Sequence, residues 1–238
     1  NGWHMINKLK RNKNIWDYYQ TEGKDVFKGS MARLSYVVKR VNCLKKTGKV
    51  LDIGLGDGSM LELFIKKGYE CFGIDIAKRS IEKIKDKFTK LGYRVELAVC
   101  NISDIKYENN KFDIVIASEV LEHLTNKDLT NGVNEVYRCL KKDGVFVATV
   151  PAEENLQEQT IFCPDCGAKF HRWGHQQSFS ISTLEDLFRG FSRTEVKRVV
   201  FPSSSMNGFG YIEHCVKRLL LANGVNITGS SFIIYAKK

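Results

Sequence analysis

A glycine-rich turn is the first feature of this sequence that could take part in chemistry. Residues 50–58 read VLDIGLGDG and stand where a predicted strand meets a helical pattern. Glycines at such a turn (here Gly54, Gly56 and Gly58) let the backbone approach a ligand closely. The spacing is not that of a nicotinamide-cofactor fingerprint, because Ser59 stands where its third glycine should be. The Gly-Lys-Ser/Thr ending of a phosphate-binding loop is also absent.

Two acidic residues accompany this turn. Asp52 lies in the predicted strand just before it, and Asp75 ends the next predicted strand. Ligands of open α/β sheets bind outside the carboxyl ends of the strands, where one carboxylate can accept hydrogen bonds from both hydroxyls of a ribose. The turn and the strand-end acid together predict a site for a ligand that contains a nucleoside.

A further polar group, Glu119, Glu122 and His123, follows the apolar run at 112–118. The ordinary pKa of histidine lies near neutrality, so His123 is a candidate base that removes a proton from an acceptor. In the alternative interpretation, this segment only closes the loop and supports the rim of the ligand site.

A polar stretch at 152–178 contains a possible metal site. Cys163-Pro-Asp-Cys166-Gly is typical of a zinc knuckle, and His171 and His175 have a spacing seen in zinc sites. We expect one structural zinc bound by these four residues, in an insertion that lines the acceptor pocket. The gap between the two pairs is too short for a DNA-binding zinc finger. In the alternative, the cysteines bind no metal and the histidines face the substrate, which makes His175 a catalytic candidate.

The elements that position these groups alternate along the chain. Strands are predicted at 49–53, 69–75, 94–100, 112–118, 145–150, 194–201 and 231–236, with helical patterns between most of them. Such alternation, with nearly continuous apolar strands, predicts an α/β fold with a mostly parallel sheet and helices on both faces. Residues 1–48 are predicted to form an N-terminal helical and basic segment. Residues 49–238 are predicted to form one domain with an insertion at 152–178.

Charge and composition restrict the partners. Lys and Arg number 37 against 27 Asp and Glu, giving a net charge of +10, which favours anionic partners such as nucleic acid, acidic lipids or phosphorylated substrates. In the alternative, the basic surface only keeps the protein soluble. Residues 5–29 are basic and include Trp16, Tyr18 and Tyr19. No apolar run is long enough to span a bilayer and no secretory pattern is evident, so we expect a cytoplasmic protein. The seven cysteines are mostly isolated, which favours reduced thiols over a disulfide framework.

Five segments together resemble the class I S-adenosylmethionine-dependent methyltransferases, in the group that includes the ubiquinone-biosynthesis O-methyltransferases. They are VLDIGLGDG (50–58), GIDIA (73–77), CNISDI (100–105), FDIVIASEVLEHL (112–124) and LKKDGVFVATVP (140–151). The resemblance implies a Rossmann-like seven-stranded sheet whose last strand is antiparallel. It also implies cofactor contacts from the glycine turn and Asp52 to the methionine part, from Asp75 to the ribose, from Asn101 and Ile102 to the adenine, and from Glu119 and Val120 at the floor. Ile76, beside Asp75, is expected to contact the cofactor as well.

The function expected from this resemblance is methyl transfer to oxygen or nitrogen of a small molecule, such as a sugar or another biosynthetic intermediate. Two alternatives remain open: an RNA methyltransferase, and a non-catalytic subunit that binds the cofactor. Glu119, Glu122 and His123 also resemble the Glu-x-x-Glu-His motif of small-RNA 3′-terminal 2′-O-methyltransferases. That similarity implies a hard divalent metal ion, with a later histidine as a further ligand. The acceptor and the oligomeric state cannot be read from the sequence.

Overall fold

A computed structural model describes residues 31–202, 208–225 and 227–238. The basic and aromatic segment predicted at 5–29, and most of the loop that follows Pro202, lie outside the described residues. Within the described ranges, no helix combines the length and the hydropathy needed to cross a bilayer.

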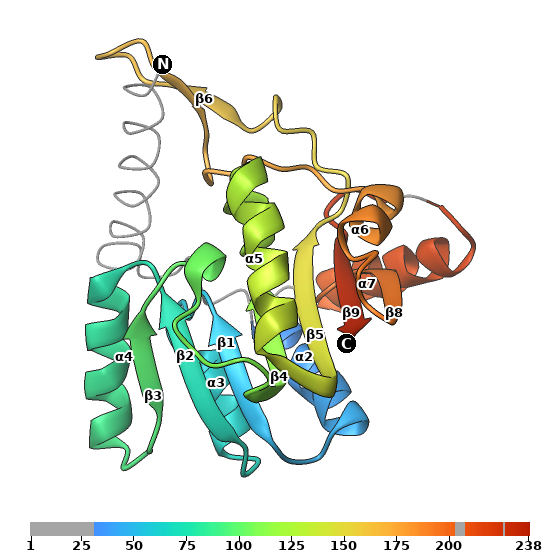
Figure 1. Cartoon of the computed structure of the whole chain (residues 1–238). Helices are drawn as coiled ribbons and strands as arrows, with labels where there is room; N and C mark the ends of the chain where they lie inside the picture. Colours follow the sequence, from blue (N-terminus) through green and yellow to red (C-terminus); the bar gives the residue numbers. More distant parts are fainter. Residues whose placement is uncertain (1–30, 203–207, 226) are drawn as a thin grey trace.

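Seven strands form the main sheet, in the order β3-β2-β1-β4-β5-β9-β8 (Figure 1). All neighbouring pairs among the first five run parallel, whereas β9 is antiparallel to both of its neighbours. The seven-stranded, mostly parallel sheet is therefore confirmed. The strands are β1 (Lys49–Ile53), β2 (Glu70–Asp75), β3 (Glu96–Val99), β4 (Phe112–Ser118), β5 (Leu140–Pro151), β8 (Arg193–Val199) and β9 (Ser231–Lys237).

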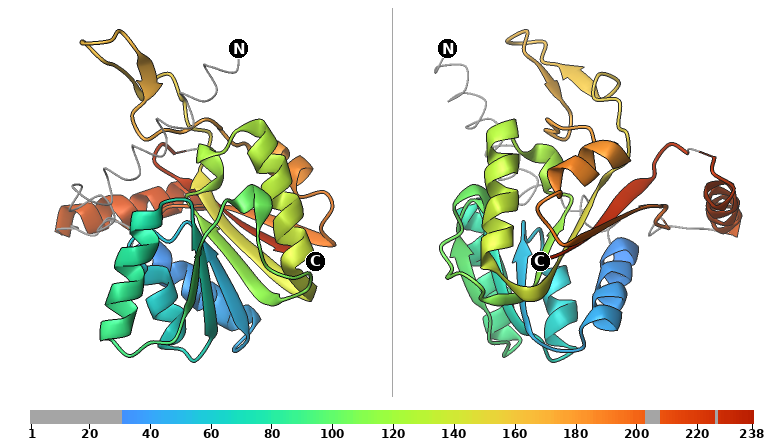
Figure 2. Two further views of the ribbon diagram at one scale, coloured as in Figure 1. Left: turned by 60° about the vertical axis from the view of Figure 1, so that its left-hand side comes forward. Right: turned by 45° about the vertical axis from the view of Figure 1, so that its right-hand side comes forward.

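Each face of the sheet has its own hydrophobic core, because successive strand residues point to opposite sides. Leu51 and Val115 pack with α5 (Asn126–Cys139) and α6 (Ile181–Leu187). Val50 and Ile114 pack on the other face with α2 (Met31–Leu44), α3 (Ser59–Ile65) and α4 (Lys78–Lys90). The predicted helices on both faces are thus present. A further helix, α7 (Gly208–Ala222), follows β8 and lies beside that edge of the sheet (Figure 2).

Residues 152–179, after β5, leave the sheet and form a small hairpin; this segment is the hairpin excursion. Its strands β6 (Thr160–Phe162) and β7 (Lys169–His171) are antiparallel, and they extend beyond the carboxyl ends of the parallel strands (Figures 1 and 2). The base of this excursion is closed, because Ala152 bridges to Phe179 and the Glu153 backbone N–H donates to the Phe179 carbonyl at 2.9 Å. The boundaries predicted for the N-terminal segment and for the insertion remain predictions, although α2 packs directly on the sheet.

Candidate functional site

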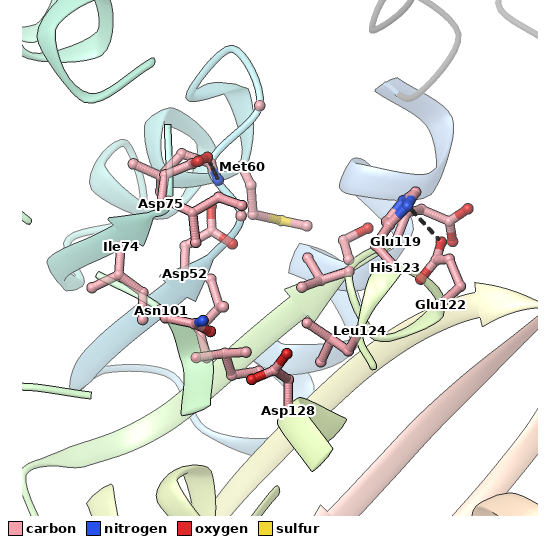
Figure 3. A pocket seen from close by; sticks show the side chains of 18 of the residues that line it. Asp52, Met60, Ile74, Asp75, Asn101, Glu119, Glu122, His123, Leu124 and Asp128 are labelled. Atoms are coloured by element: carbon pink, nitrogen blue, oxygen red, sulfur yellow. Dashed lines mark hydrogen bonds and ion pairs between the residues drawn. The ribbon is translucent and has the colours of Figure 1, made fainter. Parts of the chain in front are cut away.

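A cavity of about 530 Å³ lies at the carboxyl ends of the parallel strands. Figure 3 shows Asp52, Asp75 and Asn101 at one side of it and Glu119, Glu122 and His123 at the other. Nearly all of the residues predicted to bind the cofactor line this one cavity: Asp52, Gly54, Gly56, Asp75, Ile76, Asn101, Ile102, Glu119 and Val120. The two catalytic candidates, His123 and His175, line it too.

Gly54 is at the tightest point of the glycine turn. Its φ is +76°, and an added Cβ would lie 2.5 Å from Cγ2 of Val120. Its N–H donates to the Ile74 carbonyl at 2.9 Å, which ties the turn to β2. Gly58 is not among the described residues that line the cavity. It is the N-cap of α3, where an added Cβ would lie 3.0 Å from Cγ2 of Ile84 and 3.2 Å from Cζ of Phe88, and its contact with the cofactor stays a prediction.

Asp75 connects β2 to the glycine turn. Its Oδ2 accepts the Leu55 N–H at 3.0 Å, and its Oδ1 accepts the Ala77 N–H at 2.8 Å. Each carboxylate oxygen has more than one lone-pair site, so these bonds leave capacity for a ligand hydroxyl. The carboxylate is 8% exposed, at the edge of the cavity. Asp75 therefore shapes the turn as well as facing the ligand space.

Asp52 is a buried carboxyl group at the cavity floor. It is 2% exposed, and its Oδ2 has no hydrogen-bond partner among the described residues. Burial, with smaller effects from Asp75 and Asp57, raises the pKa of Asp52 well above its ordinary value. A buried carboxyl group without a partner is costly unless a donor or a cation satisfies it. The site therefore fits a ligand with an ammonium group, such as the methionine part of S-adenosylmethionine.

Apolar and amide groups from three other residues line the same side. Asn101 is the N-cap of η2 (Ile102–Asp104), where its Oδ1 accepts the Ser103 N–H at 3.1 Å. The Asn101 amide nitrogen remains a donor. Ile102 is 3% exposed, whereas Ile76 is 44% exposed. An exposed isoleucine beside an amide group offers a surface for a flat heterocycle that also forms hydrogen bonds.

Glu119 bends the chain directly after β4. Its φ is +57°, an uncommon conformation for a residue with a side chain, and its N–H donates to the Thr149 carbonyl at 2.9 Å. Its Oε2 lies 3.5 Å from Nη1 of Arg33 on α2. Strain of this kind is concentrated at functional sites. The bend turns the Glu119 side chain and the following residues toward the cavity.

Glu122 and His123, in η3 (Leu121–His123), are both buried beside the cavity. Glu122 is 1% exposed, and neither of its carboxyl oxygens has a hydrogen-bond partner in the described chain. Burial and then the nearby Glu119 raise the pKa of Glu122 well above its ordinary value. Burial, followed by the nearby His175, lowers the pKa of His123 to about 3. His123 is therefore neutral near pH 7.

His175 reaches the cavity because the end of the hairpin excursion is attached to η3. The Gln176 and Gln177 N–H groups both donate to the Glu122 carbonyl, at 2.7 and 3.0 Å. The Gln176 side chain donates to the His123 carbonyl at 2.6 Å. The rings of His123 and His175 consequently meet edge to face, with centroids 4.7 Å apart.

Three residues here have the arrangement that the divalent-metal alternative requires. Potential ligand atoms of Glu122, His123 and His175 all lie within 4.8 Å of one another. Glu119, the first residue of the motif, does not belong to this group. The structure thus brings the later histidine to the motif but leaves Glu119 with Arg33.

The structure does not support the predicted zinc site. Cys163 and Cys166 lie at the tip of the hairpin, where the Cys163 N–H donates to the Ala168 carbonyl. His171 lies at its base, paired with Thr160. Three residues of extended strand separate the two ends, a distance of about 10 Å. Among the described residues, the groups able to hold a metal ion contain no cysteine; His171 and His175 are instead grouped with Glu154.

Two residues of the site were missed by the sequence analysis. Arg33 enters from α2, which precedes the motif segments and belongs to none of them. Glu154 lies in the cavity wall, three residues after the end of β5. The Glu153-Glu154 pair directly after the strand-ending Pro151 was the signal for the second, since it stands at the ligand-binding edge of the sheet. Arg33 had no comparable signal.

The fold and this cavity define a Rossmann-like α/β domain with a site for a nucleoside-containing cofactor. A family profile described as a methyltransferase domain matches residues 50–144. The match supports a class I S-adenosylmethionine-dependent methyltransferase family for this part of the chain.

Individual proteins with similar sequences include methyltransferases. The sequence is 33% identical over 106 residues to a ubiquinone biosynthesis O-methyltransferase of Pelagibacter ubique, covering 44% of this chain and 43% of that protein. It is 28% identical over 169 residues to the Proteus mirabilis protein of the same name, covering 70% and 66%. The chain thus matches less than half the length of the first of these curated relatives.

A solved structure shows the same fold. It is the 1,6-didemethyltoxoflavin-N1-methyltransferase of Burkholderia thailandensis, with bound 1,6-didemethyltoxoflavin and S-adenosylhomocysteine. The TM-score is 0.71 at 16% identity, covering 100% of this chain and 90% of that one. At this identity, the similarity extends to the fold alone.

Proposed function

We propose that this chain transfers a methyl group from S-adenosylmethionine to a hydroxyl or amine of a small-molecule acceptor. One observation supports this most strongly. A single cavity contains Asp52 and Asp75 at one side and His123 and His175 at the other. A cofactor site and a possible proton acceptor therefore share one space.

In this proposal the cofactor is held by residues already in place. Asp52 and the glycine turn bind the methionine part, Asp75 binds the ribose, and Asn101 with Ile102 and Ile76 binds the adenine. Glu119 and Val120 form the floor beneath it. When bound, S-adenosylmethionine supplies a methyl group that is already electrophilic, so the protein has only to position the acceptor, exclude water and remove a proton.

His175 is the better of the two candidate bases. A base works best when its pKa lies near the working pH, and burial lowers the pKa of His123 to about 3. We therefore assign proton removal to His175 and give His123 the role of a neutral wall that holds the His175 ring in place. Trp173 and Gln176, from the hairpin excursion, complete the wall at this end.

Methyl transfer from labelled S-adenosylmethionine to a panel of catechols, phenols, sugars and amines tests this function. We expect a labelled product with at least one acceptor, and a loss of about 10²- to 10⁴-fold in His175→Asn. His214→Asn is the matched control, because His214 lies on α7 and not in the cavity wall. Absence of a product with every acceptor, from protein that binds the cofactor, would contradict the proposal.

An RNA acceptor is the second candidate. The net charge of +10 favours it, and so does the proximity of Glu122, His123 and His175, which resembles a divalent-metal site beside the methyl acceptor. Incubation with a small RNA, with Mg²⁺ or with a chelator, distinguishes the two. Labelling of the RNA 3′ end that requires the metal would favour this candidate, as would binding that weakens steeply with salt.

A further inference from the structure

Glu154 and His175 come from opposite ends of the hairpin excursion and meet at its closed base. Nδ1 of His175 is hydrogen-bonded to Oε2 of Glu154. The two side chains are 10% and 18% exposed, so little water competes for this contact. The Ala152–Phe179 bridge holds the two chain ends side by side and thereby sets this pairing.

His171 lies beside the other oxygen of the Glu154 carboxylate. Its Nδ1 accepts two backbone N–H groups, from Trp173 at 3.3 Å and from His175 at 3.1 Å. That nitrogen therefore carries no proton, and in a neutral ring the proton is on Nε2. Nε2 of His171 lies 3.5 Å from Oε1 of Glu154. Each oxygen of Glu154 consequently faces one imidazole, and the two rings stack with centroids 4.5 Å apart.

This hydrogen bonding argues against a metal ion at Glu154, His171 and His175. A histidine nitrogen binds a metal through its lone pair, and Nε2 of His171 has none to offer while Nδ1 accepts two backbone donors. The cluster is better explained as one carboxylate with a histidine at each oxygen, hydrogen-bonded to His175 and close to Nε2 of His171.

We propose that Glu154, positioned by His171, fixes His175 in the tautomer that carries its proton on Nδ1. The lone pair of Nε2 is then left for the cavity. A carboxylate that holds one ring nitrogen in this way sets both the tautomer and the orientation of the ring.

The consequence rests on the proposed function and concerns the proton of the acceptor. With a hydroxyl acceptor, the oxygen forms the new bond to the methyl carbon while the carbon–sulfur bond breaks and sulfur keeps the electron pair. The hydroxyl proton passes to Nε2 of His175. Glu154 accepts the Nδ1–H hydrogen bond throughout and stabilises the cation that forms. Glu154 and His171 are positioning residues, since neither has to touch the acceptor.

Nitrogen-15 NMR of histidine-labelled full-length protein at pH 8, with S-adenosylhomocysteine added, reads the tautomer directly. His175→Asn assigns the His175 signals. We expect the Nδ1–H form in the parent protein and at least a severalfold loss of that form in Glu154→Gln. His171→Asn should show a smaller loss in the same direction. Glu158→Gln is the matched control, an exposed glutamate of the same excursion, and should match the parent.

The catalytic consequence is measured on the acceptor that the panel identifies. Glu154→Gln should lower kcat about 10- to 100-fold and change the KM for S-adenosylmethionine by less than about threefold. The tautomer is read without turnover, so an inactive parent protein would count against the proposed function alone. A parent protein with the proton on Nε2 of His175, or a Glu154→Gln spectrum identical to the parent, would overturn the present proposal.

Discussion

Arg33 of α2 and Glu119 form an ion pair at the cavity, with Nη1 and Oε2 3.5 Å apart. Both side chains are 24% exposed, so the contact is partly shielded from water. Glu119 also has the positive φ that turns the chain after β4. The pair therefore connects the helix that precedes the domain motifs with the strained bend that faces the cofactor space.

Removing the Arg33 charge should weaken this end of the site. Arg33→Met retains the apolar stem but removes the arginine that pairs with Glu119, beside the buried Glu122. We expect a loss of about 1 kcal/mol in the free energy of unfolding, the upper range for a partly exposed pair, with weaker cofactor binding. Lys39→Met, at an exposed position of the same helix, is the control. Equal effects of the two substitutions in denaturant titrations would show that the pair has no special role.

The buried carboxyl of Glu122 should make the metal-free protein less stable as the pH rises. Burial raises the pKa of Glu122 in the folded state, whereas the unfolded chain releases this proton above about pH 4.5. The folded state then holds more protons than the unfolded state, so the free energy of unfolding falls with pH. Glu122→Gln removes this titration and should raise the thermal midpoint over the parent more at pH 8 than at pH 5.

The comparison is made by thermal melts in the presence of a chelator. A stability difference between Glu122→Gln and the parent that is the same at both pH values would contradict a raised pKa for Glu122. A parent protein that Mg²⁺ stabilises, with the effect lost in Glu122→Gln, would instead favour the divalent-metal alternative.

Gly54 should tolerate no side chain. Gly54→Ala combines a φ of +76° with a Cβ 2.5 Å from Val120, so we expect a loss of more than about 3 kcal/mol in unfolding free energy. Gly68→Ala is the matched control, because its φ is +81° and nothing lies within 4 Å of its added Cβ. It should cost only about 1 kcal/mol for the backbone conformation. Similar losses in both variants would show that the close approach of Val120 to residue 54 does not determine the effect.

The order of strands and helices could be predicted because both patterns are local. β1 and β4 have the predicted bounds, since apolar strands buried on both faces begin and end sharply in the sequence. β5 begins five residues earlier than expected, at Leu140. The polar residues Lys141, Lys142 and Asp143 hide it, but Leu140 pairs with Phe112 before the register shifts.

Residues of the site could be predicted from the sequence only where a motif stands at the carboxyl end of a strand. Asp52, Asp75 and Asn101 lie at or just after the carboxyl ends of their strands, so the topology places them together. The arrangement of the hairpin excursion could not be predicted in this way. The spacing of Cys163, Cys166, His171 and His175 in the sequence does not show which of them lie at the tip of the hairpin and which at its base. A two-stranded ladder separates the cysteines from the histidines, and the closed base joins the histidines to Glu154.

The cysteines at the hairpin tip should therefore be independent of the cavity. We expect Cys163→Ser to bind S-adenosylmethionine as the parent does and to lose less than about 0.5 kcal/mol of stability, as for other surface substitutions. His171→Asn should lose more, since it leaves two backbone donors without their acceptor. One equivalent of zinc in the parent protein, lost in both variants, would restore the four-ligand site and contradict this structure.

Cofactor binding is the central claim, and calorimetric titration with S-adenosylmethionine tests it most directly. The account predicts one saturable site per chain. It also predicts that Asp75→Ala weakens binding by about 1–3 kcal/mol. The ribose hydroxyls and the Leu55 N–H both lose their hydrogen-bond acceptor in this variant. Asp86→Ala, an exposed acid of α4 that is not among the residues lining the cavity, should bind like the parent. A folded parent protein that shows no saturable binding, or an unchanged affinity in Asp75→Ala, would contradict the assignment of this cavity.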